Sequence, residues 1–334
     1  MIEVSKKNTL VLGSNSFSGS NFINYLLSKG YSVIGVSRSP EIEKLFLGYA
    51  NNKNLANFHF YQFDLNKSTQ DIVDLCVQFK ISSVVNFAAQ SMVAQSWDSP
   101  ADWYNTNVVS FARFLQGLSN YKGLETFVNF STPEVYGSTD DWIKENFNFS
   151  PTTPYAISRA AADYHLKGLF KSFNFPVIFT RAANVYGPTQ QLYRIVPKSI
   201  LAGLLGKKIP LQGSGLSIRS FIHIDDVSKA LSLILEKGII GDSYHISTND
   251  LISIRDLLKL ISEKLSIHFD DLITETPDRK GKDYAYKLLS QKIRDELGWK
   301  EEITLESGIN KTISWAEKNL ESLRKFPMEY VHKR

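Results

Sequence analysis

The sequence predicts an α/β protein: a doubly wound parallel sheet with a smaller C-terminal substrate-binding lobe. Short apolar runs rich in β-branched residues alternate with helical patterns through the first half of the chain, and a turn bounded by two glycines, residues 13–19, follows the first run. Strands that alternate with helices build a parallel sheet covered on both faces, which binds ligands beyond the carboxyl ends of its strands. The expected architecture is therefore of the Rossmann type.

Six strands and four helices are expected in the first half of the chain. The run at 9–12 is short and apolar, as in a buried strand, and the helical pattern at 22–29 ends at Gly30. The same patterns predict further strands at 31–36, 58–61, 83–87, 127–130 and 177–180. The remaining helices fit between them at 69–79, 100–118 and 154–173.

The pattern changes after Gly187, where several prolines and glycines interrupt it. We expect the chain to leave the sheet there and to return to it as strands at 220–224 and 243–247. Helices are expected at 254–264 and 305–319, and the residues from Phe326 onward are expected to form a loosely held tail. The predicted division is a first domain at 1–187, with returning segments near 220–250, and a lobe at 188–219 and 251–325.

Composition excludes several classes of protein. The 334 residues are 43% apolar and 22% charged, and 38 basic against 34 acidic residues leave a net charge of +4 without a basic stripe, so no nucleic-acid partner is expected. No apolar run is long enough to cross a membrane and the N-terminus lacks a signal peptide, so we expect a cytoplasmic protein. The single cysteine, Cys76, is expected to be a buried thiol.

No metal site is expected. One cysteine cannot build a cysteine-rich zinc site, and no metal-ligand spacing occurs elsewhere in the chain. His223 precedes Asp225 and Asp226, but a histidine at the end of a strand beside an aspartate that caps the next helix explains this cluster better.

The turn after the first strand is predicted to bind a dinucleotide. Gly13 permits the tight turn, Gly19 lets the following helix pack closely on the strand, and the first-turn amides then face a pyrophosphate. The middle position holds Ser16 where a third glycine would let a phosphate approach closest, and its hydroxyl can donate to the phosphate instead. The residues predicted to bind the cofactor at this turn are Gly13, Asn15, Ser16, Phe17 and Gly19.

The second strand ends without the acidic residue that binds the ribose 2′-hydroxyl in NAD enzymes. Ser37 and Arg38 stand there, and an arginine between two serines suits a 2′-phosphate, although a solvated arginine would give the same pattern. The predicted cofactor is NAD(P), with NADP slightly favoured over NAD. Asp64 and Leu65 follow the third strand and are placed to meet the adenine ring.

Further motifs follow one another along the chain. They are Asn-Phe-Ala-Ala-Gln at 86–90, Ser-Thr-Pro-Glu-Val-Tyr-Gly at 131–137, Pro-Tyr-Ala-Ile-Ser-Arg at 154–159, Asn-Val-Tyr-Gly-Pro at 184–188, and the segments at 297–299 and 307–312. With the glycine turn, this set resembles the extended short-chain dehydrogenase/reductases that act on nucleotide sugars, and most of all the GDP-mannose and dTDP-glucose 4,6-dehydratases. The resemblance implies further cofactor contacts by Phe87, Ala88, Ala89, Gln90 and Asn107.

The resemblance also implies a catalytic site formed by Thr132, Glu134, Tyr155 and Arg159. Tyr155 and Arg159 lie four residues apart at the start of a helix, hence on one face. A phenol whose pKa is about 10 is a poor base at neutral pH, and a neighbouring cation favours its phenolate. The family has lysine where this chain has Arg159, whose planar fork can still hydrogen bond to a ribose.

Glu134 distinguishes the reactions that such a site can catalyse. By the resemblance, Tyr155 and Thr132 bind the sugar 4-hydroxyl, oxidation makes a C4 ketone, and Glu134 removes the acidified C5 proton. Water then leaves C6 and the hydride returns to C6, which makes a 4-keto-6-deoxy sugar nucleotide. The dTDP-glucose type carries an acid before the glutamate to protonate the leaving hydroxyl, whereas this chain has Pro133, so Thr132, Glu134 or a water must serve.

Two alternatives to a nucleotide-sugar 4,6-dehydratase lyase stay open. A nucleotide-sugar 4-epimerase or 4-dehydrogenase would use Tyr155 without Glu134. A catalytically silent NAD(P)-binding regulatory protein would account for the three departures from the family pattern, which are Ser16, Pro133 and Arg159. The retained tyrosine, threonine and glutamate argue against silence.

The expected partner is a nucleotide-diphosphate sugar. A GDP-sugar is slightly favoured, because residues 89–96 resemble the GDP-mannose type. Arg219 matches the family's phosphate-contacting arginine, which can grip a phosphate through two hydrogen bonds, and Asn184 matches a residue that hydrogen bonds to the sugar phosphate. The other predicted substrate-binding residues are Ser91, Thr132, Arg194 and Arg279.

A homodimer, or a tetramer built from it, is expected by the same resemblance. In the family, the helix after the fourth strand and the helix that carries the tyrosine pair with their copies as a four-helix bundle. Apolar residues on these two helices offer such a surface: Val108, Val109, Phe111, Phe114, Leu115 and Leu118 on the first, and Ala160, Ala161, Ala162 and Leu166 on the second. The alternative is that both stripes face the sheet.

Overall fold

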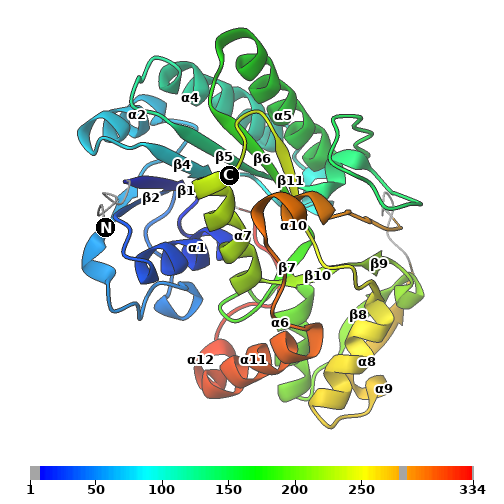
Figure 1. The fold of residues 1–334 in the computed structure, drawn as a ribbon. Coiled ribbons are helices and arrows are strands. Elements are labelled where there is room, and N and C mark those ends of the chain that lie inside the picture. The colour runs from blue at the N-terminus through cyan, green and yellow to red at the C-terminus, as the bar shows by residue number, and fades with distance from the viewer. Residues whose placement is uncertain (1–7, 278–283, 333–334) are drawn as a thin grey trace.

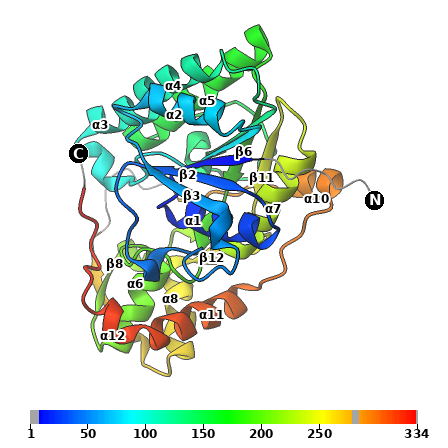
Figure 2. The same cartoon turned by 90° about the vertical axis from the view of Figure 1, so that its left-hand side faces the viewer.

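The computed structural model describes residues 8–277 and 284–332, and it confirms the predicted fold class. A seven-stranded parallel sheet has the strand order β11-β6-β5-β4-β1-β2-β3 (Figure 1). Helices α1 and α7 pack together on one face, and α2, α4 and α5 cover the other (Figure 2). Each face buries its own apolar core, as the sequence alternation of strands and helices requires.

The elements of the sheet and its covering layers are as follows. The strands are β1 Thr9–Leu12, β2 Val33–Ser37, β3 Phe58–Gln62, β4 Ser83–Asn86, β5 Thr126–Ser131, β6 Val177–Ala182 and β11 Ser243–Ile246. The helices are α1 Phe17–Ser28, α2 Thr69–Gln78, α3 Pro100–Tyr104, α4 Phe111–Leu118, α5 Pro154–Phe173, α7 Ile224–Lys237 and α10 Gln291–Leu297. The short helical turns are η1 Lys44–Phe46, η2 Leu55–Asn57, η3 Ala94–Trp97, η4 Asn105–Ser110 and η5 Pro133–Tyr136.

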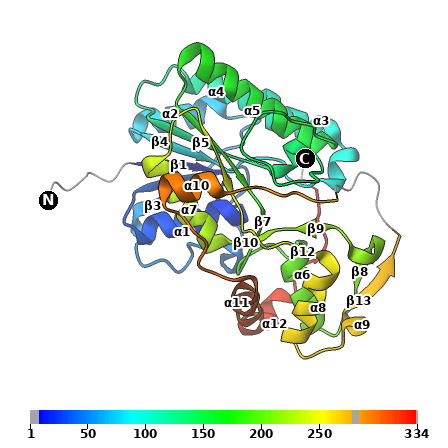
Figure 3. The ribbon, with the colours of Figure 1, turned by 45° about the vertical axis from the view of Figure 1, so that its right-hand side comes forward.

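The smaller lobe packs around a third core, below the sheet in Figure 3. Its strands are β8 Ile209–Gln212, β9 Ile218–Arg219, β12 Ile252–Ser253 and β13 Ile273–Thr276, with the turn η6 Gly213–Gly215. Its helices are α6 Ile195–Leu204, α8 Ile254–Lys264, α9 Phe269–Leu272, α11 Leu305–Lys318 and α12 Leu320–Leu323. Because this core is separate from the two sheet cores, we propose domain limits near residues 187, 219 and 250.

The strand order places the ligand site. Strand β1 lies between β2 and β4, with Leu12 opposite Asn86 in register. The segments that follow β1 and β4 therefore start side by side and turn to opposite faces of the sheet. Open α/β sheets bind ligands at such a switch point.

Three predicted elements differ from the structure. Helix α1 begins at Phe17 instead of residue 22, because the Ser16 side chain accepts a hydrogen bond from the Gly19 amide at 3.0 Å and caps the helix. The helix expected at 100–118 is divided by the π-helical turn η4, Asn105–Ser110. The strand expected to return to the sheet at 220–224 forms as β10 Phe221–His223, but it pairs with β7 Asn184–Tyr186 in a separate two-stranded sheet.

Most of the apolar residues expected at a dimer face are buried within this chain, including Ala160, Ala162 and Leu166 on α5. The stripe on α4, Phe111, Phe114, Leu115 and Leu118, is buried in the core of this chain, so the expectation that it faces a partner is wrong. Other apolar side chains nearby stay exposed: Val109 in η4 is 43% exposed, and Ile157 and Tyr164 on α5 are 42% and 48% exposed.

Residues 326–332 do not form the loose tail that the sequence predicts. Phe326 packs edge-on against Phe46 with ring centroids 5.1 Å apart, and His332 stacks on Trp103 of α3 at 4.9 Å. Figure 2 shows the chain running from α12 in the small lobe up to α3 beside the sheet. Residues 326–332 are thus fixed at both ends, since each end finds an aromatic partner.

Cys76 is fully buried, and burial raises the pKa of its thiol to about 12, as expected of a structural cysteine. Among the helices of the described residues, none has the length and apolarity that a bilayer-spanning helix needs.

Candidate active site

A cleft of about 1090 Å³ lies at the carboxyl ends of the strands and extends into the small lobe. The glycine turn after β1, the segment after β4, the ends of β2 and β5, and the start of α5 contribute its walls. From the lobe side it is lined by Gln190–Val196 and by residues around Arg219. One cleft therefore collects most residues that the sequence predicted for both cofactor and substrate.

The glycine turn has the geometry that a bound pyrophosphate needs. Gly13 has φ +80°, and a Cβ there would lie 2.8 Å from the Ala88 amide nitrogen, so only glycine fits between β1 and the loop after β4. A Cβ on Gly19 would lie 2.3 Å from the Gly13 carbonyl oxygen, which explains the close packing of α1. Phe17 and Ser18 line the cleft at the first turn of α1, whose amides have no acceptor within the helix.

The end of β2 forms the next part of the cofactor wall. The Ser37 hydroxyl oxygen accepts a hydrogen bond from the Asn15 amide at 2.9 Å, and the Asn15 side chain donates to the Ser39 carbonyl at 3.0 Å. These bonds tie the glycine turn to the segment that carries Arg38, which lines the cleft. Asp64 and Leu65 also line it, as predicted for residues that meet an adenine ring.

The loop after β4 is held by buried amide side chains. The Asn86 side chain accepts a hydrogen bond from the Ala88 main-chain amide. The Asn107 side chain makes two hydrogen bonds to the main chain of Gln90, accepting from the amide at 2.8 Å and donating to the carbonyl at 3.0 Å. Residues 87–91 line the cleft, whereas Asn107 is 2% exposed and lies outside the lining. Its place indicates support of the cofactor loop and not a contact with the cofactor.

Thr132, Glu134 and Tyr155 meet in the cleft as the sequence predicted. Thr132 is the cap of the short helix η5, and its hydroxyl oxygen accepts a hydrogen bond from the Glu134 amide at 3.3 Å. Pro133 occupies the first helical position, where its missing N–H costs nothing. Tyr155 is hydrogen bonded to the Thr132 side chain, and its phenol interacts electrostatically with the negative charge of Glu134.

Burial raises the pKa of the Tyr155 phenol above its ordinary value, and the Glu134 carboxylate adds to the rise. The Arg159 guanidinium is the strongest opposing influence, and the hydrogen bond from Thr132 and the charge of Arg194 oppose the rise as well. The cation beside Tyr155 therefore acts in the predicted direction. Burial outweighs it among the groups of this chain, so their net effect is a raised pKa.

Arg159 is itself a buried cation, 3% exposed. Its Nη2 donates to the main-chain carbonyl of Phe130 at 2.5 Å, which couples the helix bearing Tyr155 to the end of β5. The Nε of Arg159 has no hydrogen-bond partner among the described residues. A lysine, which the family has at this position, would place a compact ammonium charge where Arg159 has a planar guanidinium.

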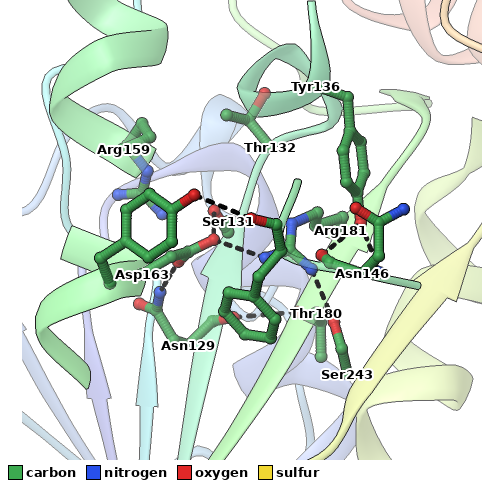
Figure 4. A network of polar contacts seen from close by, with 12 residues as sticks. Asn129, Ser131, Thr132, Tyr136, Asn146, Arg159, Asp163, Thr180, Arg181 and Ser243 are labelled. Atoms are coloured by element: carbon green, nitrogen blue, oxygen red, sulfur yellow. Dashed lines mark hydrogen bonds and ion pairs between the residues drawn. The ribbon is translucent and has the colours of Figure 1, made fainter. Parts of the chain in front are cut away.

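One turn beyond Arg159, Asp163 lies in a buried polar network (Figure 4). Its carboxylate accepts hydrogen bonds from Asn129 and Ser131 at 2.9 Å each, and pairs with Arg181 at 2.7 Å. Both members of this pair are fully buried, and Arg181 also donates to Ser243 at 2.6 Å. The network joins α5 to β5, β6 and β11 directly beneath Thr132 (Figure 4).

The predicted substrate residues lie on the lobe side of the cleft. Arg219 stacks on Tyr286 at 4.5 Å and donates to the carbonyls of Ile218 and Tyr284 at 2.7 and 2.9 Å. Arg194 donates to the Ser91 hydroxyl at 3.3 Å, which joins two predicted substrate-binding residues from distant segments. Asn184 also lines the cleft. Arg279 falls outside the described residues.

No cluster of potential metal ligands occurs within residues 8–277 and 284–332. The interpretation of His223 needs correction, because the histidine itself caps α7: its Nδ1 accepts a hydrogen bond from the Asp225 amide at 3.2 Å. Burial lowers the pKa of His223 to about 4, in agreement with a neutral acceptor ring.

Several cleft residues were missed by sequence reasoning. They include Ile42, Asn66, Thr106, Gln190, Tyr193, Tyr286, Glu329 and Tyr330. Most lie in irregular segments with no motif, and Tyr330 belongs to the C-terminal segment that was expected to be loose. Only the aromatic character of Tyr193 and Tyr330, two large side chains in polar segments, offered a signal.

Comparison with known proteins gives consistent results. The family model described as GDP-mannose 4,6 dehydratase matches residues 10–312. A dTDP-glucose 4,6-dehydratase of Neisseria gonorrhoeae is 30% identical over 93% of this chain and 95% of its own, and a dTDP-D-glucose 4,6-dehydratase of Mus musculus is 33% identical over 97% and 94%. The chain spans about half the length, 48%, of a trifunctional UDP-glucose 4,6-dehydratase of Arabidopsis thaliana, to which it is 31% identical.

Solved structures share the fold. A dTDP-glucose 4,6-dehydratase from Streptomyces venezuelae with NAD bound superposes with a TM-score of 0.85 at 29% identity, covering 94% of this chain and 98% of that one. A UDP-glucose 4-epimerase from Thermotoga maritima with UDP-glucose superposes with a TM-score of 0.84 at 27% identity, covering 94% and 99%.

Proposed function

The chain belongs to the nucleotide-sugar 4,6-dehydratase family of the extended short-chain dehydrogenase/reductases, and from this premise we propose that it makes a 4-keto-6-deoxy sugar nucleotide. The observation that supports the proposal most is the meeting of Thr132, Glu134 and Tyr155 in one cleft. A carboxylate beside the tyrosine is what elimination requires and what epimerisation does not use.

The residues around the cleft fit a dinucleotide. The tight turn at Gly13, the first-turn amides of α1 and the hydroxyl of Ser16 form a donor set suited to a pyrophosphate. When bound, the dinucleotide supplies the acceptor for a hydride. Every other part of the reaction falls to side chains of this chain.

Tyr155 acts as the base for the sugar 4-hydroxyl. Its hydrogen bond to Thr132 orients the phenol, and Arg159 stabilises the phenolate against the effect of burial. As a hydride leaves C4, the proton of the 4-hydroxyl passes to Tyr155, which leaves a C4 ketone. The positions of Thr132 and Tyr155 in the cleft let both side chains address the same hydroxyl.

Glu134 then removes the C5 proton, which the ketone has acidified. Hydroxide leaves C6 with a proton and the hydride returns to C6. Solvent supplies the proton that C5 regains, and Tyr155 gives the proton of the 4-hydroxyl back to solvent, so the overall reaction releases one water and leaves the cofactor unchanged. Pro133 has no proton to give, and the Thr132 hydroxyl already binds Tyr155. We therefore assign the proton of the leaving water to Glu134, which acquires it from C5 one step earlier.

We propose a pyrimidine nucleoside diphosphate-glucose as the substrate and NAD as the cofactor. The curated relatives are named for dTDP-glucose or UDP-glucose, and homologous structures hold NAD. The preferences for a GDP-sugar and for NADP, drawn from residues 89–96 and Arg38, stay predictions to be tested against these. Arg194, Arg219 and Asn184 are proposed to hold the diphosphate and the sugar.

The decisive experiment incubates the purified protein with NAD and, separately, dTDP-glucose, UDP-glucose and GDP-mannose in deuterated water. The proposal expects a product lighter by one water, with deuterium at C5, from one of the pyrimidine sugars. Conversion of GDP-mannose alone would replace the proposed substrate. Epimerised product without water loss would establish the 4-epimerase alternative, and no turnover of any sugar by the holoenzyme would favour the silent protein.

We also propose a homodimer through η4 and α5. The exposed apolar side chains Val109, Ile157 and Tyr164 support this face, in place of the buried stripe on α4. Light scattering at micromolar concentration should give a dimer, and Ile157→Lys should give a monomer because a charge cannot be buried at a symmetric contact without a partner. A monomeric wild-type protein would contradict the proposal.

A further inference from the structure

The C-terminal strap, which we define as residues 326–332, crosses from the small lobe to the sheet domain and forms part of the cleft wall. Phe326 packs on Phe46, and Glu329 pairs with Lys198 of α6 at 2.6 Å. These contacts fix the lobe end of the strap.

The far end of the strap is fixed on α3. His332 Nε2 is hydrogen bonded to the Asp102 carboxylate at 2.9 Å, and its ring lies nearly parallel to Trp103, at 19° and 4.9 Å. Just after Trp103, Thr106 is hydrogen bonded to Asn66, the residue that follows the predicted adenine contacts. The strap therefore ends on α3, directly before the turn η4, whose Thr106 lines the cleft near the predicted adenine contacts.

Between these two ends, Tyr330 faces the cleft. Its ring meets Tyr193 edge-on at 5.2 Å, and its hydroxyl is hydrogen bonded to His332 at 3.3 Å. The positive charges of Arg38 and Arg194 lower the pKa of the Tyr330 phenol. Burial raises that pKa by more, so its net value is above the ordinary one. Tyr330, Arg38 and Arg194 all line the same cleft.

We propose that the C-terminal strap is part of the dinucleotide-binding site, and that Tyr330 covers the adenosine diphosphate half of the cofactor beside Arg38. A strap fixed on both sides of a cleft must detach at one end before a long ligand can leave. Dissociation is then slowed by the contacts that hold the strap, above all the pair between His332 and Asp102.

This inference rests on the proposed function for its purpose. In a reaction that returns the hydride to the substrate, the cofactor is regenerated in each turnover and has no need to exchange. A strap that retains the dinucleotide suits such an enzyme, whereas it would hinder a dehydrogenase that must release reduced cofactor each cycle.

The test measures retention of NAD by the holoenzyme. Protein loaded with labelled NAD is diluted into excess unlabelled NAD, and the bound label is followed with time. Tyr330→Ala and His332→Ala should each release NAD roughly tenfold faster, as expected for the loss of one or two favourable contacts. Tyr25→Ala on α1, which removes a partly exposed tyrosine outside both the cleft and the proposed dimer face, is the matched control and should release NAD as the wild type does.

A double-mutant cycle separates the strap contact from general damage. If Asp102→Asn and His332→Ala act through one contact, the double variant should release NAD no faster than the faster single variant. Additive acceleration, or release at the wild-type rate from Tyr330→Ala and His332→Ala, would overturn the proposal. Melting temperatures near that of the wild type show that the variants are folded.

The readout also separates this inference from the proposed function. NAD release is measured without sugar, so faster release from the strap variants supports the strap even if no 4-keto-6-deoxy product forms. Normal dehydration with unchanged NAD release from the variants would reject the strap and leave the proposed function intact. A chain that holds no NAD at all would reject the strap directly.

Discussion

Arg159 donates from Nη2 to the carbonyl oxygen of Phe130 at 2.5 Å, so the cation next to the candidate catalytic tyrosine is anchored to strand β5, which ends immediately before Thr132. A lysine would supply the same charge from a compact ammonium group, whereas the planar guanidinium of Arg159 directs Nη2 at the strand. The arginine therefore lowers the pKa of Tyr155 and also joins α5 to β5.

Removing this cation should move the pH profile. The Arg159 charge lowers the pKa of Tyr155, so Arg159→Met raises that pKa, and the rise of kcat with pH should move to higher pH. At a fixed pH below the pKa of Tyr155, each rise of that pKa by about one unit lowers the phenolate fraction, and hence the rate, about tenfold. Arg159→Lys keeps the charge and should move the profile less. Identical pH profiles for the wild type and Arg159→Met would remove Arg159 from the control of Tyr155.

Glu134→Gln should separate oxidation from elimination. Loss of a general base lowers the rate of its step by about 10²–10⁴-fold, so product formation should nearly stop. Because the Glu134 charge also raises the pKa of Tyr155, its removal should leave C4 oxidation possible, and reduced nicotinamide should accumulate when sugar is added. Absorbance of reduced nicotinamide follows this directly, with Tyr155→Phe as the control that shows none. Unchanged deuterium incorporation at C5 would clear Glu134 of its role.

Asp163→Asn should destabilise the protein strongly. It leaves the fully buried Arg181 without its counter-ion, and breaking such a pair typically costs about 3–5 kcal/mol. The midpoint of urea unfolding should fall accordingly. The exposed pair of Glu321 with Arg324 provides the contrast, since Glu321→Gln should leave the midpoint almost unchanged. Equal midpoints for both variants would mean that solvent reaches the network.

Stability should fall in mild acid. Burial lowers the pKa of His223 to about 4 and that of His245 to about 3, from an ordinary value of 6.5. Both rings are neutral in the folded protein, so below pH 6.5 the unfolded chain binds protons that the folded chain refuses. The free energy of unfolding is then highest above pH 6.5 and decreases towards pH 4, by up to about 1.4 kcal/mol per pH unit for each histidine.

Urea unfolding between pH 7 and pH 4 tests this dependence. His223→Asn keeps a good helix cap and lacks the titrating ring, so its stability should fall less steeply over that range. A variant as steep as the wild type would show that His223 is protonated in the folded protein.

Local signals explain which elements the sequence predicted well. Helix α5 was predicted at its observed limits, because Thr153 caps it, Pro154 occupies its first position and Asn174 ends it in the left-handed conformation. Helix α8 begins at a similar cap, Ser253. The π-helical turn η4 lacks any such local mark, and the pairing of β10 with β7 depends on segments more than thirty residues apart.

The site residues divide in the same way, into those that local sequence patterns predict and those that depend on contacts between distant segments. Spacing alone put Tyr155 and Arg159 on one helix face, and the strand–turn–helix pattern alone indicated that Gly13 lies at the ligand cleft. The partners of Asp163 could not be predicted, because Asn129, Ser131 and Arg181 come from two other strands. Likewise, nothing local indicates that Tyr330 would meet Tyr193 from the far end of the chain.

By itself, then, the sequence determined the parallel sheet, the glycine turn and the types of residue in the candidate site. Periodicity, turn chemistry and helical spacing depend only on residues that are a few positions apart in the chain. The tertiary structure alone decided the net direction of the Tyr155 pKa, the capping role of His223 and the course of residues 326–332. Burial and electrostatic interaction sum over groups that are close in space, and those groups come from elements whose separation along the chain carries no trace of their contact.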